Sequence, residues 1–260
     1  MNLKHLRQWS LRLSLSLALV VVGIGDIAGA RDFLNDESYE DQAATEVYDP
    51  IEPFNRVVFT FNDKVFLWVL NPVATGYSKV LPSDIRGCIG NFFYNLGEPV
   101  RSVNCLLQGR FRDSGLALSR FAINTIGGVF GLADAATEAF KINRVKGTLG
   151  QTFSVWGIGD GFYLVVPLLG PSTLRDFSGD LGEALATTAW YYPWDDDFVT
   201  SATVFGIQDI NYISLHLGAY EDIKSMSIDP YVAFRNAYFQ ARNKTSDHLV
   251  LPNPTININR

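Results

Sequence analysis

The side chains that could carry out chemistry in this 260-residue chain do not form a catalytic pattern. Nucleophilic catalysis needs a base beside the nucleophile, and beyond Arg31 the chain has two histidines, His216 and His248. Ser172 lies in a GPSTL stretch that lacks the second glycine of a nucleophile elbow. A lipid hydrolase built on Ser172, His216 and Asp176 is therefore the least favoured interpretation, and we expect no enzyme.

Motifs for cofactors and metals are also incomplete. The glycine-rich stretch 157–161 (GIGDG) lacks the spacing of a dinucleotide-binding loop and the lysine of a phosphate-binding loop. The acidic run 195–197 (DDD) could hold calcium, but its spacing does not match an EF-hand loop, and a solvated turn is the favoured interpretation. The sequence therefore predicts no cofactor and no metal ion.

The two cysteines leave two alternatives open. Cys88 and Cys105 flank the sequence GEP at 97–99, which is a turn signal. An antiparallel pair of segments would bring the thiols opposite each other, and an oxidising compartment would allow a disulfide. The alternative is two small buried thiols, because helix axes about 8–10 Å apart often hold the Cα atoms too far apart for a bond.

The N-terminus has the three-part order of a secretory signal peptide. Basic residues precede the uncharged run 13–25, and small residues follow, which places the predicted cleavage between Ala30 and Arg31. The uncharged run is shorter than the roughly 20 residues that a membrane span needs. Because Arg31 stands where a lipoprotein carries its acylated cysteine, we expect export without lipidation.

Composition restricts the partners of the chain. Charged residues make up 18% of it, against about 25% in ordinary soluble domains, and its formal net charge is −6. A negative chain is a poor partner for nucleic acid and for simple electrostatic docking on anionic lipid headgroups. Any attachment to a membrane is therefore expected to be hydrophobic.

Apolar stretches in the chain are numerous but short. The longest uncharged runs cover 65–78, 121–133, 147–159 and 161–174, all too short for a transmembrane helix. Residues 54–70 lie between two prolines that suit a helix start and stop, and residues 116–140 suit two short helices joined by a glycine hairpin. With further helices expected at 178–190, 197–220 and 230–242, the predicted fold class is all-α.

We expect four parts along the chain. Residues 1–30 form the signal peptide, and residues 31–47 form an acidic leader. Residues 48–242 show no obvious linker and form one helical domain, and residues 243–260 form an extended tail.

Several long strings in a fixed order resemble the MlaA (VacJ) family of outer-membrane lipid-transport proteins. The strings are YDPIEPFNRVVFTFND (48–63), LPSDIRGCIGNFFYNLGEPV (81–100), LLQGR (106–110), RFAINTIGGVFGLADAA (120–136), LGQTFSVWGIGDGFYLVVPLLGPSTLRDFSGD (149–180) and SIDPYVAFRNAYFQAR (227–242). The resemblance implies a ring-like bundle of short helices embedded in the inner leaflet of the outer membrane. It also implies an amphipathic channel that removes mislocalised phospholipid from that membrane.

The implied partners are phospholipid, a trimeric outer-membrane porin and a soluble periplasmic lipid carrier. Family members are typically acylated, and the missing cysteine is the departure of this chain from the pattern. The alternative function is a non-catalytic envelope scaffold that uses the same apolar surface to bind a porin. Co-purified phospholipid would separate the two.

The resemblance also suggests which residues lie beside the channel. A helix in one leaflet meets about 15 Å of hydrocarbon, so short apolar segments are sufficient there, and Arg175 and Asp176 are expected to pair because an unpaired charge in lipid is costly. Gly127, Gly128 and Gly131 are predicted hinges of a hairpin at the channel, and replacing Gly127 and Gly128 with alanine should slow lipid transfer without affecting folding. The remaining channel candidates are Asn124, Phe130, Phe153 and Tyr163.

Overall fold

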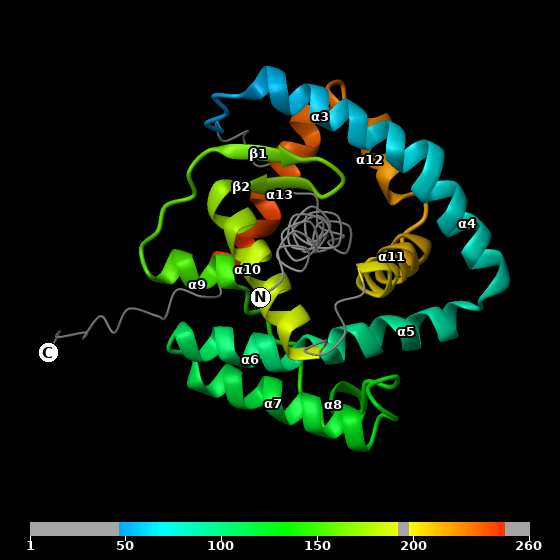
Figure 1. Ribbon diagram of the computed structural model, residues 1–260, viewed down its shortest axis with the longest axis vertical. Helices are drawn as coiled ribbons and strands as arrows, with labels where there is room; N and C mark the ends of the chain where they lie inside the picture. The colour runs from blue at the N-terminus through cyan, green and yellow to red at the C-terminus, as the bar shows by residue number, and fades with distance from the viewer. Residues whose placement is uncertain (1–46, 192–197, 248–260) are drawn as a thin grey trace, which may run out of the picture.

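The computed structural model describes residues 47–191 and 198–247 (Figure 1). The predicted cleavage site at Ala30 and Arg31, most of the acidic leader, the run 195–197 and His248 lie outside the described residues. The elements are α3 (Glu52–Val65), η1 (Phe66–Leu70), α4 (Asn71–Val80), α5 (Ser83–Leu96), α6 (Glu98–Leu107), α7 (Phe111–Ile126), α8 (Ala135–Glu138), α9 (Leu149–Val155), β1 (Tyr163–Val166), β2 (Gly170–Thr173), α10 (Leu174–Tyr191), α11 (Phe198–Leu215), α12 (Ala219–Met226) and α13 (Pro230–Asp247).

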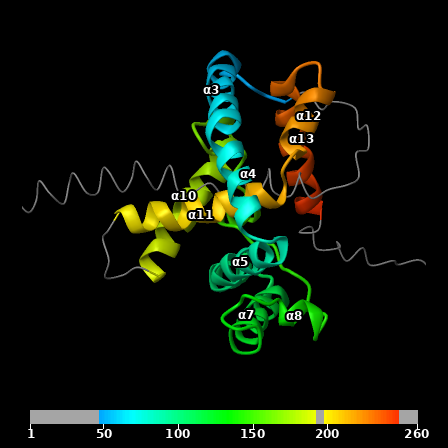
Figure 2. The same cartoon turned by 90° about the vertical axis from the view of Figure 1, so that its right-hand side faces the viewer.

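These elements are arranged around a ring (Figure 1). The α3–η1–α4 segment forms one arc, α5 and α6 continue along the next side, and α9 with the two strands leads back to α3. Helix α7 packs along the outer side of α6 with α8 beside it, while α12 and α13 lie on one face of the ring (Figures 1 and 2). The expected class of mostly helical, ring-like fold is confirmed.

The apolar segment 161–174 forms the two antiparallel strands β1 and β2, which departs from an all-helical wall. Their register pairs Tyr163 with Thr173 and Val166 with Gly170. Leu168, in the turn, has a φ of 67°, and Gly170 has a φ of 91°. These left-handed conformations are incompatible with a helix, so the Gly and Pro residues of this segment bend it back on itself instead.

Helix α3 continues into α4 instead of ending before Pro72. The intervening element η1 is a π-helix, in which the backbone N–H of Asn71 bonds to the carbonyl of Phe66. Pro72 lies in the first turn of α4, where the N–H that proline lacks is not required. The wider π-helical turn therefore carries the chain past a proline that the sequence pattern predicted to be a stop.

Two asparagines on α3 fix the strand β1 against that helix. The amide of Asn55 donates to Tyr163 O at 3.1 Å and accepts from Val165 N at 2.9 Å. About two helical turns further along α3, the amide of Asn62 donates to Val166 O at 2.9 Å and accepts from Leu168 N at 2.7 Å. Each amide replaces a missing strand partner, so these two polar residues of an otherwise apolar helix satisfy backbone groups of β1 and of the turn that follows it.

The main apolar cluster lies where α3, β1 and α13 meet. Val58, Tyr163, Val165, Tyr231 and Tyr238 are all buried there. Tyr163 is 1% exposed, and its ring contacts the rings of both other tyrosines at centroid distances of 6.2–6.3 Å. Burial raises the pKa of the Tyr163 hydroxyl far above its usual value. This region is an aromatic core of the ring wall.

Gly97 bends the chain slightly and does not reverse it. Its backbone is helical (φ −77°, ψ −12°), so α6 follows α5 along the same side of the ring (Figure 1). The antiparallel arrangement considered for the cysteines is therefore wrong, and both Cys88 and Cys105 are free thiols. Cys105 is fully buried beside the backbone of Gly147, where burial raises its thiol pKa, while Cys88 is only half-buried.

Helix α13 runs to Asp247, so the segment Asn243–Asp247 is helical and the predicted start of an extended tail at 243 is wrong. The reason is local, because neither glycine nor proline occurs between Pro230 and Pro252 to stop the helix. Within the described ranges, none of the helices combines the length and the apolarity that crossing a membrane requires.

Candidate functional site

The glycine hairpin after α7 exposes a cluster of large apolar side chains. It covers residues 127–134 and joins α7 to α8. Val129 and Phe130 at its tip are 63% and 72% exposed, and Ile126 at its base is 86% exposed. A tip of this kind is costly in water, so it indicates contact with lipid or with another protein.

Of the three glycines that the sequence indicated as hinges, Gly131 is left-handed, but the other left-handed residues of the hairpin are not glycines. Val129 and Phe130 have φ values of 53° and 57°, and Gly131 has 91°, whereas Gly127 remains helical. A β-branched residue such as valine is strained in that region, by about 1–3 kcal/mol. The hairpin therefore stores backbone strain at its exposed tip.

Two of the three glycines are required by close packing. A Cβ on Gly131 would lie 2.6 Å from the side chain of Asn95 on α5, and a Cβ on Gly128 would lie 2.2 Å from Ala133 O. The expectation that alanine at Gly127 and Gly128 leaves folding unaffected is thus wrong for Gly128. Gly127 is less crowded, because its added Cβ would meet only Ile123 O, at 3.1 Å.

A buried ion cluster holds the base of the hairpin. Arg120 on α7 is completely buried, and its Nε donates to Glu98 at 2.8 Å. Its terminal nitrogen donates to both carboxylate oxygens of Asp134, at 2.9 and 3.0 Å. Arg101 pairs with the same Glu98 at 3.1 Å. We call these four residues the Arg120 cluster.

Neutral side chains complete the Arg120 cluster. Asn124 is 3% exposed, and its amide donates to Asp134 at 3.1 Å and accepts from Ala136 N at 2.8 Å. Thr137 also donates to Asp134, at 2.9 Å. Burial alone would raise the pKa of Asp134, but hydrogen bonds from Arg120, Thr137 and Asn124 lower it to about 2. Asn124 is therefore a residue that ties the two ends of the hairpin together.

Arg175 and Asp176 are paired, as the sequence predicted, within a larger network. Arg175 is 7% exposed and contacts Asp176 at 3.1 Å and Asp160 at 2.6 Å. Arg242 on α13 contacts the other oxygen of Asp176 at 2.9 Å, and the hydroxyl of Tyr238 donates to it at 2.6 Å. The pair thus fastens the start of α10 to α13.

The remaining predicted channel residues lie in different surroundings. Tyr163 belongs to the aromatic core described above. Phe153 on α9 is half-buried, with its ring centroid 6.1 Å from that of Trp156. Phe130 lies at the hairpin tip. The prediction that these side chains face a channel stays a prediction.

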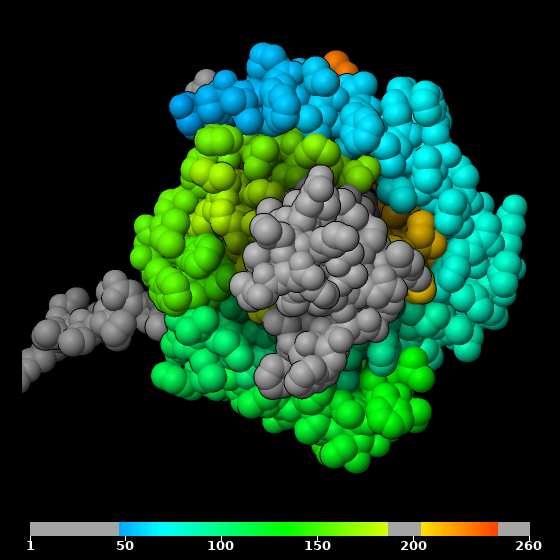
Figure 3. Space-filling model, viewed as in Figure 1, coloured from blue at the N-terminus to red at the C-terminus, as the bar shows by residue number. Residues whose placement is uncertain are grey.

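Large apolar side chains are exposed on several of the helices that form the ring. On α3, η1 and α4, which form a continuous edge in Figure 3, seven are more than half exposed: Phe54, Val57, Phe61, Trp68, Val69, Val73 and Val80. On α6 and α7 the series continues with Val103, Phe111 and Leu118. Exposed apolar surface on successive helices indicates a membrane or protein interface.

The side chains considered for hydrolysis are engaged separately. Ser172 donates to Thr173 O at 3.2 Å, the ring of His216 stacks on Tyr212 at 4.2 Å, and Asp176 belongs to the Arg175 network. In residues 47–191 and 198–247, no group of three or more His, Cys, Asp or Glu side chains is placed to hold a metal ion. The described geometry therefore offers apolar surfaces and ion clusters in place of a triad or a metal centre.

Comparison with known proteins places this architecture in a family. The family model described as MlaA lipoprotein matches residues 47–245. The "Intermembrane phospholipid transport system lipoprotein MlaA" of Escherichia coli K12 is 34% identical over 195 residues, covering 74% of this chain and 76% of that protein. The protein of the same name from Shigella flexneri is 35% identical, with the same coverage of both chains.

Two further comparisons extend the range of relatives. An uncharacterised protein of Rickettsia felis is 34% identical over 199 residues, or 76% of this chain and 77% of that one. A solved structure, described as "Structural basis for maintenance of bacterial outer membrane lipid asymmetry", superimposes with a TM-score of 0.63 at 33% identity. That match covers 76% of this chain and 98% of the other.

Proposed function

The chain belongs to the MlaA lipoprotein family, and from that premise we propose that it is the outer-membrane component of an intermembrane phospholipid transport system. It removes mislocalised phospholipid from the outer membrane through an amphipathic channel and passes it to a soluble periplasmic carrier. The observation that carries the proposal is the exposed apolar edge on α3–η1–α4 in a chain that is 34% identical to a named transport protein.

The exposed edge supports residence in one leaflet. Trp68 and Val80, both more than 70% exposed, lie on helices that are too short or too polar to cross a membrane. A helix with an exposed apolar face can lie in the membrane interface, where that face is buried among acyl chains. Attachment through this face would be hydrophobic, as the composition of the chain predicts. Association with a porin would use the same exposed surface.

Transport is tested by extraction and lipid analysis. The protein should stay in the outer-membrane pellet through high salt, leave it with detergent and carry phospholipid when purified. After reconstitution it should move a fluorescent phospholipid between vesicles in the presence of the carrier. Porin co-purification without bound lipid or transfer would instead establish the scaffold function.

The hairpin provides the proposed gate of this channel. Its apolar tip is exposed and strained at Val129 and Phe130, while its base is fixed by the Arg120 cluster. A fixed base with a movable tip is the arrangement of a hinge, in which a few residues absorb the backbone change. Lateral movement of the tip would admit an acyl chain from the leaflet.

Gly127 is the position at which this hinge can be tested. Gly127→Ala should slow phospholipid transfer and leave the unfolding transition nearly unchanged, because the added Cβ meets a single carbonyl. Gly115→Ala on α7 is the matched control, since nothing lies within 4 Å of a Cβ there. Gly115→Ala should transfer lipid at the parent rate. If Gly127→Ala does so as well, the hinge proposal is wrong.

A further inference from the structure

A groove beside α7 is lined by cations in a chain of net negative charge. It lies between the start of α7 and the segment that follows α8, and its volume is about 570 Å³. Five cationic side chains line it, with one carboxylate: Arg110, Arg112, Lys141, Arg144, Lys146 and Asp113. The chain as a whole has a formal net charge of −6, so this local excess of positive charge runs against the average.

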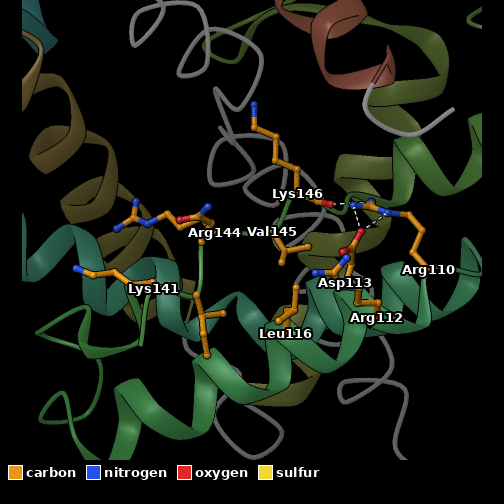
Figure 4. Close-up of a pocket in the computed structure, with 10 residues that line it drawn as sticks. Arg110, Arg112, Asp113, Leu116, Lys141, Arg144, Val145 and Lys146 are labelled. Atoms are coloured by element: carbon orange, nitrogen blue, oxygen red, sulfur yellow. Dashed lines mark hydrogen bonds and ion pairs between the residues drawn. The ribbon is translucent and has the colours of Figure 1, made fainter. Parts of the chain in front are cut away.

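Some of these cations are held in place by partners within the groove. Arg110 donates to Asp113 at 2.8 Å and to Lys146 O at 2.8 Å, which fixes its guanidinium on one side (Figure 4). Arg144 and Lys141 stand on the other side (Figure 4). The amide oxygen of Asn91 accepts from Arg144 at 2.7 Å. Oriented cations lose less conformational entropy when an anion binds between them.

Arg112 and Lys141 supply positive charge that no carboxylate among the described residues neutralises. Neither has an ion-pair partner in the described part of the chain, and Lys141 Nζ donates only to the neutral carbonyl of Glu138, at 2.9 Å. Both side chains are exposed at the groove. They are therefore available to an incoming anion.

The backbone at Lys141 is strained. Its φ is 56°, in the left-handed region that favours glycine or asparagine. Lysine has no side-chain feature that stabilises this conformation, so the surrounding structure must hold it in place. The backbone outlier thus lies in the lining of the groove, where it motivates a hypothesis of function.

The floor of the groove is aliphatic. Leu116, Ile142 and Val145 line it, and Val145 is buried. A cationic rim over an aliphatic floor matches a phosphate group attached to an apolar body. Guanidinium groups pair with carboxylates as well as with phosphates, but a tetrahedral phosphate presents oxygens to cations on both sides of the groove, whereas the two oxygens of a carboxylate lie in one plane.

We propose that this groove is a phosphate-binding site and that it takes the phosphodiester of a phospholipid headgroup. Arg112 and Lys141 neutralise the phosphate, and Leu116, Ile142 and Val145 contact the glycerol and first methylenes. The choice of a lipid as the source of the phosphate rests on the proposed function. The phosphate chemistry itself rests on the groove alone.

The test uses the full protein in a non-ionic detergent and two probes, inorganic phosphate and dihexanoyl phosphatidylglycerol. Both should bind the parent protein in calorimetric titrations, the lipid more tightly because of the aliphatic floor. Arg112→Gln combined with Lys141→Gln should weaken both by about five-fold for each charge removed. Lys64→Gln combined with Lys79→Gln removes the same charge from α3 and α4 and should leave both affinities unchanged.

The remaining outcomes decide between sources and classes of ligand. Equal affinity for the two probes would keep the phosphate site but overturn its assignment to a lipid. Unchanged phosphate binding in the Arg112 and Lys141 variant would overturn the site, while vesicle transfer by the parent would still support the proposed function. Groove-dependent binding of a polyglutamate peptide, with neither phosphate probe bound, would overturn the proposal in favour of an acidic protein partner.

Discussion

The Arg120 cluster and the phosphate groove lie close together and contain the same types of residue. The charges of the cluster are buried and paired, whereas two cations of the groove are exposed and unpaired among the described residues. In the cluster, Arg120 and Glu98 are completely buried, and each charge is met by opposite charges and hydrogen bonds. In the groove, Arg112 and Lys141 are exposed and have no carboxylate partner among the described residues. Arg144 reaches both, at 3.4 Å from Asp134 on one side and as part of the groove lining on the other.

Desolvation explains the difference. A buried charge without a partner costs several kcal/mol, so a buried arginine persists only inside a satisfied network. An exposed cation retains its water and remains available to a ligand. The ring of Tyr94, which lies 4.3 Å from the Arg144 guanidinium and 3.7 Å from that of Arg101, packs between these surroundings. Burial therefore separates structural arginines from ligand-binding ones.

The largest effect should come from Arg120→Met. It leaves the buried carboxylates of Glu98 and Asp134 without their main partner, which should lower the free energy of unfolding by about 3–5 kcal/mol. Denaturant unfolding of the detergent-solubilised protein measures the change. Arg112→Met in the groove is the control and should stay within about 0.5 kcal/mol. Equal losses in the two variants would remove the distinction between cluster and groove.

The second-largest effect should come from acid, which lowers the contribution of the Arg120 cluster to the stability of the fold. The folded pKa of Asp134 is about 2, below the usual 3.8, so its ionisation stabilises the fold above about pH 4 and that contribution is lost as pH falls toward 2. The contribution is on the order of 2 kcal/mol. Unfolding midpoints measured between pH 5 and 2.5 should fall less steeply in Asp134→Asn than in the parent. Parallel slopes would show that Asp134 is not the titrating group.

Lys141→Asn should have a smaller effect of opposite sign on stability. Asparagine adopts a φ near 56° more readily than lysine, so the unfolding free energy should rise by about 0.5 kcal/mol. Phosphate affinity should fall at the same time because the cation is lost. A purely structural Lys141 would instead leave phosphate binding unchanged, as titration of the purified variant would reveal.

Salt should hardly change the contribution of the Arg120 cluster to the free energy of unfolding, but it should clearly weaken phosphate binding in the groove. Raising ionic strength from about 0.05 M to 0.5 M screens exposed charges but hardly reaches buried ones. Phosphate binding should therefore weaken several-fold, while the Arg120→Met loss in unfolding free energy stays the same. A salt-dependent loss would indicate that water reaches Arg120.

Much of the helical architecture could be predicted from the sequence. The short uncharged runs, the glycines after α7 and the adjacent Arg175 and Asp176 are local patterns, and the structure has short helices, a hairpin and a paired network at those places. The family strings cover the same range as the matched model. Local patterns succeed because helix, turn and neighbouring-charge preferences depend on residues only a few positions apart.

Other features depended on contacts between distant residues. Gly97 allows either a turn or a helical bend, and packing of α6 on α7 decides for the bend. Asn55 and Asn62 were polar interruptions in the sequence, and only the arrival of β1, more than 100 residues away, gives them hydrogen-bond partners. The sequence of α3 by itself does not predict that β1 packs against it.

The distribution of charge shows most clearly what the sequence determines and what only the tertiary structure determines. The sequence alone determined a net charge of −6, and from that average we expected no electrostatic recognition of anionic lipid headgroups. The tertiary structure decided which cations are neutralised, because Arg120 meets Glu98 and Asp134, 22 and 14 residues away, while Arg112 meets no carboxylate in the described chain. Electrostatic interactions depend on distance and burial in space, and neither is a property of composition.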